Sequence, residues 1–186
     1  LGATYRMSTR LKGYSTNYRY ATQSSVVDTL RHSVDTLAHG NVRFGDEIGV
    51  GIALKGGEKW HVEFVYLRSG WGKSGMDTAP GFSAIGDSKF TATTSQSFRL
   101  GFEIIPNRND IRYYMRRCAY RAGVYYDQSY YKLDGNNVNS MGITFGITLP
   151  VFRWYNGLTL GVDLGQKAST RHDMIRERYA RIVVGF

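Results

Sequence analysis

The chain has 186 residues and a formal net charge of +9, and it contains 14 Tyr, 22 Gly and only 3 Pro. Such a length fits a single domain, and this richness in tyrosine and glycine favours β-structure over a helical bundle. No segment approaches the roughly 18 consecutive apolar residues of a membrane-spanning helix, and the single Cys118 excludes an internal disulfide bond and a multi-cysteine metal site.

Residues 1–12 alternate between apolar and polar side chains, which is the period-two pattern of a half-buried strand. The chain therefore begins inside a strand, and we expect that upstream sequence has been lost. The next segment, 14–41, is a long polar connection in which a few apolar residues have helical spacing. These residues predict a short amphipathic helix: Val26, Val27, Leu30, Val34 and Leu37.

The alternation of residues 1–12 recurs in seven later segments, which gives eight strands in all. The seven segments are 48–55, 59–66, 97–104, 117–126, 141–149, 157–165 and 179–186. The links between strands are long and polar at 14–41, 69–89, 127–137 and 166–173, and short at 56–57, 106–110 and 150–156. Long and short links gather at opposite rims of outer-membrane barrels.

The sequence thus predicts an all-β protein, an antiparallel up-and-down transmembrane β-barrel with about eight strands present. Its expected location is the outer membrane of a diderm (Gram-negative-type) bacterium, with the C-terminus on the periplasmic side. The net positive charge also fits nucleic-acid binding, but the basic residues are dispersed and no recognition motif accompanies them. We expect no nucleic-acid partner.

The strands have one apolar face and one charged face. Placing the charged face against hydrocarbon would cost roughly 2 to 4 kcal/mol for each arginine near the midplane, so we expect the apolar face to contact the lipid bilayer. The candidate site is then the set of inward polar residues, which would line a substrate path or contact a plug. These residues are Arg6, Arg10, His61, Glu63, Arg99, Glu103, Arg117, Arg121, Asp163 and Arg181.

Glycines are frequent on the same inward face, and they indicate either strong bending of the strands or space kept for a plug or a ligand. They are Gly49, Gly51, Gly142, Gly146, Gly157, Gly161 and Gly165. An enzyme is the least favoured hypothesis. His61 beside Glu63 could form an acid–base pair, but no nucleophile motif accompanies it and no histidine has a ligand-spaced partner. We expect no catalysis, no cofactor and no metal.

Five segments carry a resemblance to a known family: 60–71, 101–103, 113–135, 142–150 and 176–179. In these segments the chain resembles the C-terminal half of the long-chain fatty-acid transporter (FadL-type) family of outer-membrane proteins. The resemblance implies a larger barrel of about fourteen strands with an N-terminal plug. Residues 1–186 would then be one barrel domain, the C-terminal portion, without the N-terminal strands and the plug, and Phe186 need not be the true end.

The function implied by this resemblance is passive uptake of hydrophobic, fatty-acid-like small molecules across the outer membrane. The alternative is a structural or accessory barrel subunit of a multi-protein outer-membrane complex, with outer-membrane protein partners. Transport predicts a continuous apolar pocket and a gap in the wall. An accessory role predicts a filled lumen and a large contact patch.

Overall fold

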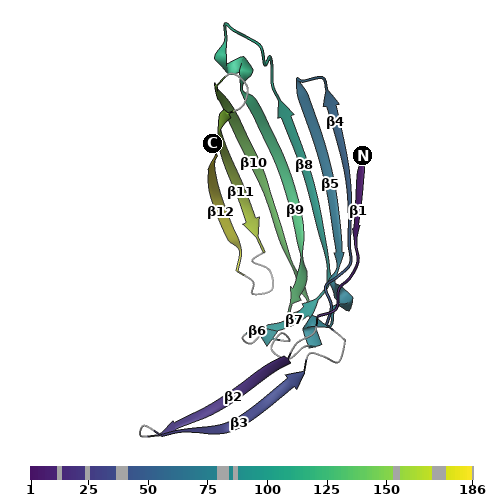
Figure 1. The fold of residues 1–186 in the computed structure, drawn as a ribbon, viewed down its shortest axis with the longest axis vertical. Helices are drawn as coiled ribbons and strands as arrows, with labels where there is room; N and C mark the ends of the chain where they lie inside the picture. Colours follow the sequence, from purple (N-terminus) through teal and green to yellow (C-terminus); the bar gives the residue numbers. More distant parts are fainter. Residues whose placement is uncertain are drawn as a thin grey trace.

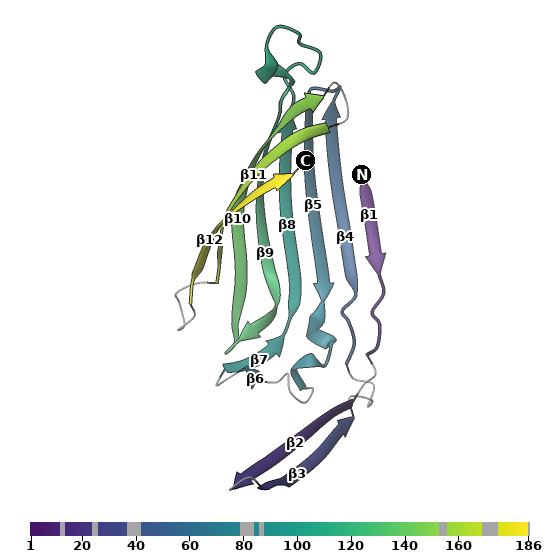
Figure 2. The same ribbon diagram turned by 60° about the vertical axis from the view of Figure 1, so that its left-hand side comes forward.

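The main feature of the computed structural model is a curved antiparallel sheet (Figures 1 and 2). The structure describes residues 1–11, 14–23, 26–36, 42–78, 84–85, 88–152, 156–168 and 175–185. Within these ranges eight strands follow one another across the sheet: β1 (Gly2–Arg6), β4 (Glu47–Gly56), β5 (Trp60–Gly70), β8 (Thr94–Ile104), β9 (Ala119–Leu133), β10 (Asn136–Phe152), β11 (Asn156–Lys167) and β12 (Glu177–Gly185). The predicted all-β, up-and-down arrangement of about eight strands is confirmed.

The sheet is open in the described part of the chain, because β1 and β12 form its two edges and do not pair with each other. Neighbouring strands are joined by antiparallel ladders, for example ten residue pairs between β4 and β5 from Glu47↔Ser69 to Gly56↔Trp60. The ladders of β10 with β9 and with β11 each contain one register shift. Among the described residues, no helix is both long and apolar enough to cross a bilayer.

The two faces of the sheet follow the alternation of the sequence. On one face, Tyr66, Phe98 and Tyr126 lie side by side on β5, β8 and β9, with ring centroids 4.8 and 6.4 Å apart. The large apolar side chains of this outward face are exposed, as in Leu100 at 46% and Val124 at 50%. Residues of the opposite parity, such as Arg99 and Tyr125 in the adjacent register row, belong to the other face.

The predicted helix within 14–41 is wrong, since the structure forms a hairpin of β2 (Tyr14–Gln23) and β3 (Val26–Thr36) there (Figure 1). Four of its five predicted apolar positions lie in β3, and Leu37 lies outside the described residues. The segment contains several Val and Thr residues, whose branched side chains favour extended backbone. Pairing with β2, as in Thr16↔Val34, therefore outweighs the helical spacing.

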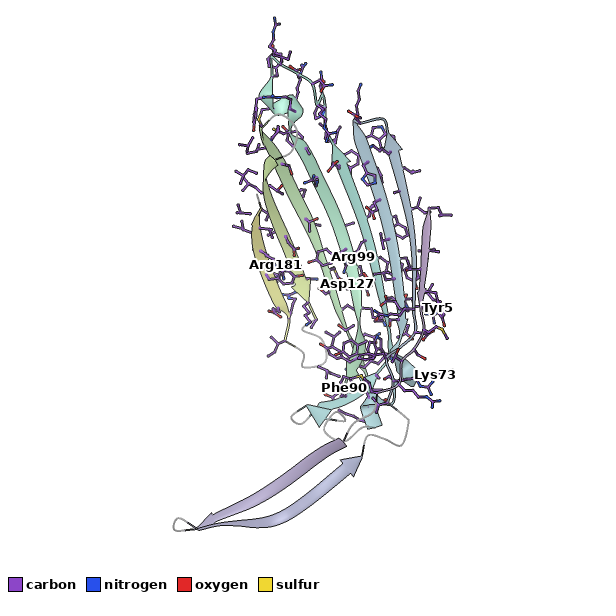
Figure 3. The ribbon with its side chains drawn as sticks, in the orientation of Figure 1. Tyr5, Lys73, Phe90, Arg99, Asp127 and Arg181 are labelled. Atoms are coloured by element: carbon purple, nitrogen blue, oxygen red, sulfur yellow. The ribbon has the colours of Figure 1, made fainter. Side chains whose placement is uncertain are left out.

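A small core lies at the end of the sheet near the β2–β3 hairpin. It is formed by the connection between β5 and β8 together with β9. This connection contains the 3₁₀ turns η1 (Trp71–Lys73) and η2 (Met76–Thr78) and the strands β6 (Ala84–Ile85) and β7 (Ser88–Ala92), and β7 pairs with β9. Trp71 packs on Tyr130 at 5.2 Å and Phe90 on Tyr131 at 5.9 Å. Phe90 is 7% exposed, and Figure 3 shows it near the lower ends of the strands.

Two connections differ from the prediction. The expected loop at 127–137 is mostly strand, because β9 and β10 continue to a tight turn at Asp134 and Gly135, both with positive φ as in a type I′ hairpin. The expected short turn at 106–110 belongs to a longer loop, residues 105–118, which contains η3 (Tyr114–Arg117). This 105–118 loop lies at the end of the sheet opposite the β2–β3 hairpin (Figure 1).

Cys118 ends the 105–118 loop and is fully buried. Its thiol points to the carbonyl oxygen of Tyr114 at 3.7 Å, and burial raises the pKa of the thiol. Because the thiolate is the reactive form, we expect Cys118 to resist maleimide in the folded protein and to react on unfolding. Ile111→Cys in a Cys118→Ala background is the positive control, since Ile111 is 99% exposed. If native Cys118 were labelled as fast as the cysteine introduced in this control, the loop would not pack as described.

Candidate functional site

The charged face of the sheet lines an open hollow of about 870 Å³, from β5 on one side to β12 on the other. Seven of the ten predicted inward residues line it: His61, Glu63, Arg99, Glu103, Arg121, Asp163 and Arg181. Figure 3 shows Arg99 in the middle of the sheet and Arg181 on β12. The alternation of the strands therefore brings together residues more than one hundred positions apart in sequence.

The other three predicted residues lie outside the hollow. Arg6 on β1 forms an ion pair with Glu47 at 2.9 Å, near the end of the sheet that carries the β2–β3 hairpin. Arg10 follows β1 and forms an isolated bridge with Arg43. Arg117 is in η3, where its guanidinium lies 5.0 Å from the centre of the Tyr114 ring. The predicted strand at 117–126 began too early, because a turn of 3₁₀ helix precedes β9.

A first polar network crosses four strands, β8 to β11, on this face. Arg121 on β9 donates from Nε to Glu103 on β8 at 2.6 Å and from a terminal nitrogen to the hydroxyl of Thr148 on β10 at 2.7 Å. Thr148 in turn bonds to the hydroxyl of Thr159 on β11 at 2.9 Å. Arg121 and Glu103 are 46% and 30% exposed, so water screens the ion pair and its contribution to stability is small. The network fixes side-chain positions and neutralises the face.

A second network connects β9, β11 and β12. The hydroxyl of Tyr125 donates to the carboxylate of Asp163 at 2.9 Å and is in hydrogen-bond contact with the hydroxyl of Tyr179. Because Tyr125 donates its only hydroxyl proton to Asp163, Tyr179 must donate the second bond. Arg181 is the register partner of Asp163, and its guanidinium lies 5.9 Å from the centre of the Tyr179 ring.

Two glycines, Gly142 and Gly165, leave room for the side chains of Tyr125 and Tyr179. A Cβ on Gly142 would collide with the Tyr125 hydroxyl, and a Cβ on Gly165 would lie 2.5 Å from Tyr179 and 2.6 Å from Tyr125. The tyrosine side chains thus lie across backbone that has no side chain of its own. At Gly142 and Gly165 the glycines accommodate side chains of the same sheet, which neither of the two alternatives from the sequence had described.

Charge is nearly balanced within the hollow. Its lining includes three arginines and four carboxylates, and Arg99 approaches Asp127 at 3.8 Å. The sequence prediction missed Asp127, Tyr125 and Tyr179 as members of this site. Asp127 was assigned to a loop, whereas the parity of Tyr125 and Tyr179 already placed them on the inward face and could have identified them.

We expect Tyr125→Phe to lower the free energy of unfolding by about 1 to 2 kcal/mol, because it removes the donor to Asp163 and the acceptor for Tyr179. Urea unfolding in lipid vesicles would measure the change. Tyr126→Phe is the matched control on the outward face, where the ring still packs on Phe98, and its expected effect is below about 0.5 kcal/mol. Equal effects of the two substitutions would contradict the assigned network.

Comparison with known families bears on the two functions considered for this chain. The sequence model of the BamG family matches residues 3–186, which include nearly all of the eight-stranded sheet. The chain belongs to the BamG family. This family is associated with the Bam complex and the bacterial outer membrane, so the predicted location in the outer membrane is confirmed. No curated protein and no solved structure matches the chain.

Two predictions are corrected by the family match. The resemblance to fatty-acid transporters of the FadL type is wrong, and so is passive uptake of hydrophobic molecules as the function. The physical reason is that the resemblance depended on strand patterns. Alternating faces and aromatic residues at strand ends arise in outer-membrane barrels generally, because every such barrel meets the same lipid.

Proposed function

We propose that this BamG-family protein is an accessory subunit of the outer-membrane assembly machinery, the Bam complex, and that it acts by binding other subunits without catalysing a reaction. The observation that carries the proposal is the family match over residues 3–186. The sheet would anchor the subunit in the outer membrane through its apolar face, and its partners would be other outer-membrane proteins of the complex.

The described residues leave a hollow where an accessory barrel was expected to have a filled lumen, but the chemistry of the charged face argues against transport. A path for fatty-acid-like molecules needs a continuous apolar surface, since a polar group that loses water without gaining a partner costs free energy. The hollow is instead crossed by the Glu103–Arg121–Thr148 chain and the Tyr125–Asp163 bond. These side chains bind one another, which favours a wall that holds its shape.

The proposal includes closure of the sheet within the membrane. Unpaired backbone N–H and C=O groups are costly in hydrocarbon, where no water can satisfy them. The edges of β1 and β12 are therefore proposed to pair with further strands, so that the described sheet forms part of the wall of a barrel. The end with the 105–118 loop would face the periplasm, because outer-membrane barrels carry their longer extensions outside, here the β2–β3 hairpin and the β5–β8 connection.

Depletion of the protein in its native bacterium would test the function. We expect lower amounts of folded, heat-modifiable β-barrel proteins in the outer membrane, and unchanged uptake of a labelled long-chain fatty acid per amount of remaining transporter. Normal barrel assembly after complete depletion would contradict a role of this subunit in assembly. A direct loss of fatty-acid uptake with normal assembly would contradict the proposal as a whole.

A further inference from the structure

Among the described residues, the 105–118 loop is the longest extension at its end of the sheet. It connects β8 with β9, and Figures 1 and 2 show it projecting past the ends of these strands. At the same end, β4 and β5 are joined by a tight turn at 57–59. Residues near the apex of the loop therefore lie farther from the membrane-spanning part of the sheet than the other described residues at this rim.

Hydrogen bonds hold the loop in one shape. The carboxylate of Asp110 accepts from the backbone N–H groups of Arg112 and Tyr113, both at 2.9 Å, and forms an ion pair with Arg116 at 3.3 Å. The N–H of Tyr113 lowers the pKa of Asp110, so the carboxylate is ionised at neutral pH and these bonds persist there.

The base of the loop is fixed to the sheet. The hydroxyl of Tyr114 donates to the backbone carbonyl of Pro150 on β10 at 3.0 Å, and that of Tyr120 donates to the carbonyl of Met115, also at 3.0 Å. Cys118 is fully buried beneath this turn. A surface that is already ordered loses little conformational entropy on binding, so the loop is prepared for a specific partner.

The exposed surface of the loop combines positive charge with apolar and aromatic groups. The loop has four arginines, at 108, 112, 116 and 117, against the single Asp110, and the first three are exposed. Ile111 is 99% exposed, and Tyr113 and Met115 are more than half exposed. Arginine, tyrosine and methionine are enriched in protein interfaces, and a lone exposed isoleucine between arginines suits a pocket with an acidic rim.

We propose that the 105–118 loop is a docking surface for a protein subunit of the Bam complex, which presents an apolar socket for Ile111 bordered by Asp and Glu residues. This inference rests on the proposed function. A lipid surface is the competing occupant, because arginine also binds phosphate headgroups. The protein is favoured because the loop projects beyond the strands and is ordered by its own hydrogen bonds, which attraction to headgroups does not require.

Site-specific photocrosslinking in intact cells tests the occupant. A benzoylphenylalanine at position 111 of the full chain is expected to form an adduct with a subunit of the Bam complex, identified by mass spectrometry. The same group at Glu58, in the exposed β4–β5 turn at the same rim, is the control and is expected to give at least about ten-fold less of that adduct. Adducts with lipid alone, or equal adducts at both positions, would overturn the proposal.

Charge reversal tests the arginines. We expect R108E/R112E to lower co-purification of the Bam complex at physiological salt by about ten-fold or more, because it places like charges against the acidic rim. K55E/K59E changes the charge equally at the same end of the sheet, and little loss is expected. The inference would be overturned if both double substitutions lowered co-purification, or if neither did. Failure of the wild-type chain to co-purify would refute the proposed function itself. Heat-modifiability on gels verifies folding, and the crosslink at position 111 does not depend on these variants.

Discussion

Leu100→Arg is expected to destabilise the protein in a lipid bilayer by about 2 to 4 kcal/mol, the cost of an arginine near the membrane midplane on the lipid face of a barrel. Leu100 lies in the middle of β8 on the outward, apolar face, between Phe64 and Val124 in the register. The measurement is denaturant unfolding in phospholipid vesicles, together with the amount of protein assembled in the outer membrane.

Gly101→Arg is the matched control, because it introduces the same charge one residue further along the same strand. A Cβ at Gly101 would meet no atom within 4 Å, and the register partner on β5 is the carboxylate-bearing Glu63. The new arginine would face water and an opposite charge, so we expect a change of less than about 1 kcal/mol. If Gly101→Arg were as harmful as Leu100→Arg, the assignment of the two faces would be wrong.

Gly142→Ala is expected to lower the free energy of unfolding by about 1 to 3 kcal/mol, in the range of overpacking substitutions. The added Cβ would lie 2.8 Å from the backbone carbonyl oxygen of Leu164 and would collide with the Tyr125 side chain. The tyrosine can move only by losing its bond to Asp163, whereas the carbonyl belongs to the adjacent strand and cannot move alone. Equilibrium unfolding in vesicles would measure the loss.

Gly161→Ala, on the neighbouring strand β11, separates this steric effect from the general effect of replacing a glycine. Its Cβ would make ordinary contacts of 3.8 Å with Phe145 and Val183, so we expect it to be neutral or slightly stabilising. In a Tyr125→Ala background, the cost of Gly142→Ala should become smaller, since one of its two collisions is gone. An unchanged cost in that background would exclude Tyr125 as a cause.

Most of the fold could be predicted because the pattern that specifies each strand lies within that strand. Alternation of period two is visible in one strand at a time, and it identified all eight strands of the meander. The β2–β3 hairpin was missed because Val26, Leu30 and Val34 also satisfy a helical period, and the cross-strand partners that favour extended backbone are not visible in one segment. The long β9–β10 hairpin was missed because Asp127 and Gln128 look like loop residues.

For the site residues, the sequence could predict only the face of the sheet on which each one lies. Alternation placed His61, Asp163 and Arg181 on one face, yet it could not show which side chains meet, since that depends on the register between strands. The Tyr125–Tyr179 contact joins β9 to β12 across two intervening strands. It exists because Gly142 and Gly165 leave room for both rings, and such a relation appears only when four strands are aligned.

Function could not be reached from these patterns, because lipid imposes them on transporters and accessory subunits alike. The family match over residues 3–186 favoured the accessory role, which had been the second choice. The polar contacts of the charged face also favour the accessory role over transport. They join residues of the sheet to one another, as in the Glu103–Arg121 pair.

Purification of the tagged full chain from mildly solubilised outer membranes, followed by native mass measurement of the purified assembly, would show whether the chain is a subunit of the Bam complex. We expect the chain to be recovered in a particle of defined stoichiometry with the subunits of the Bam complex. Recovery of the chain alone, or with partners that vary between preparations while the intact Bam complex is obtained without it, would show that the chain is not a subunit of the Bam complex.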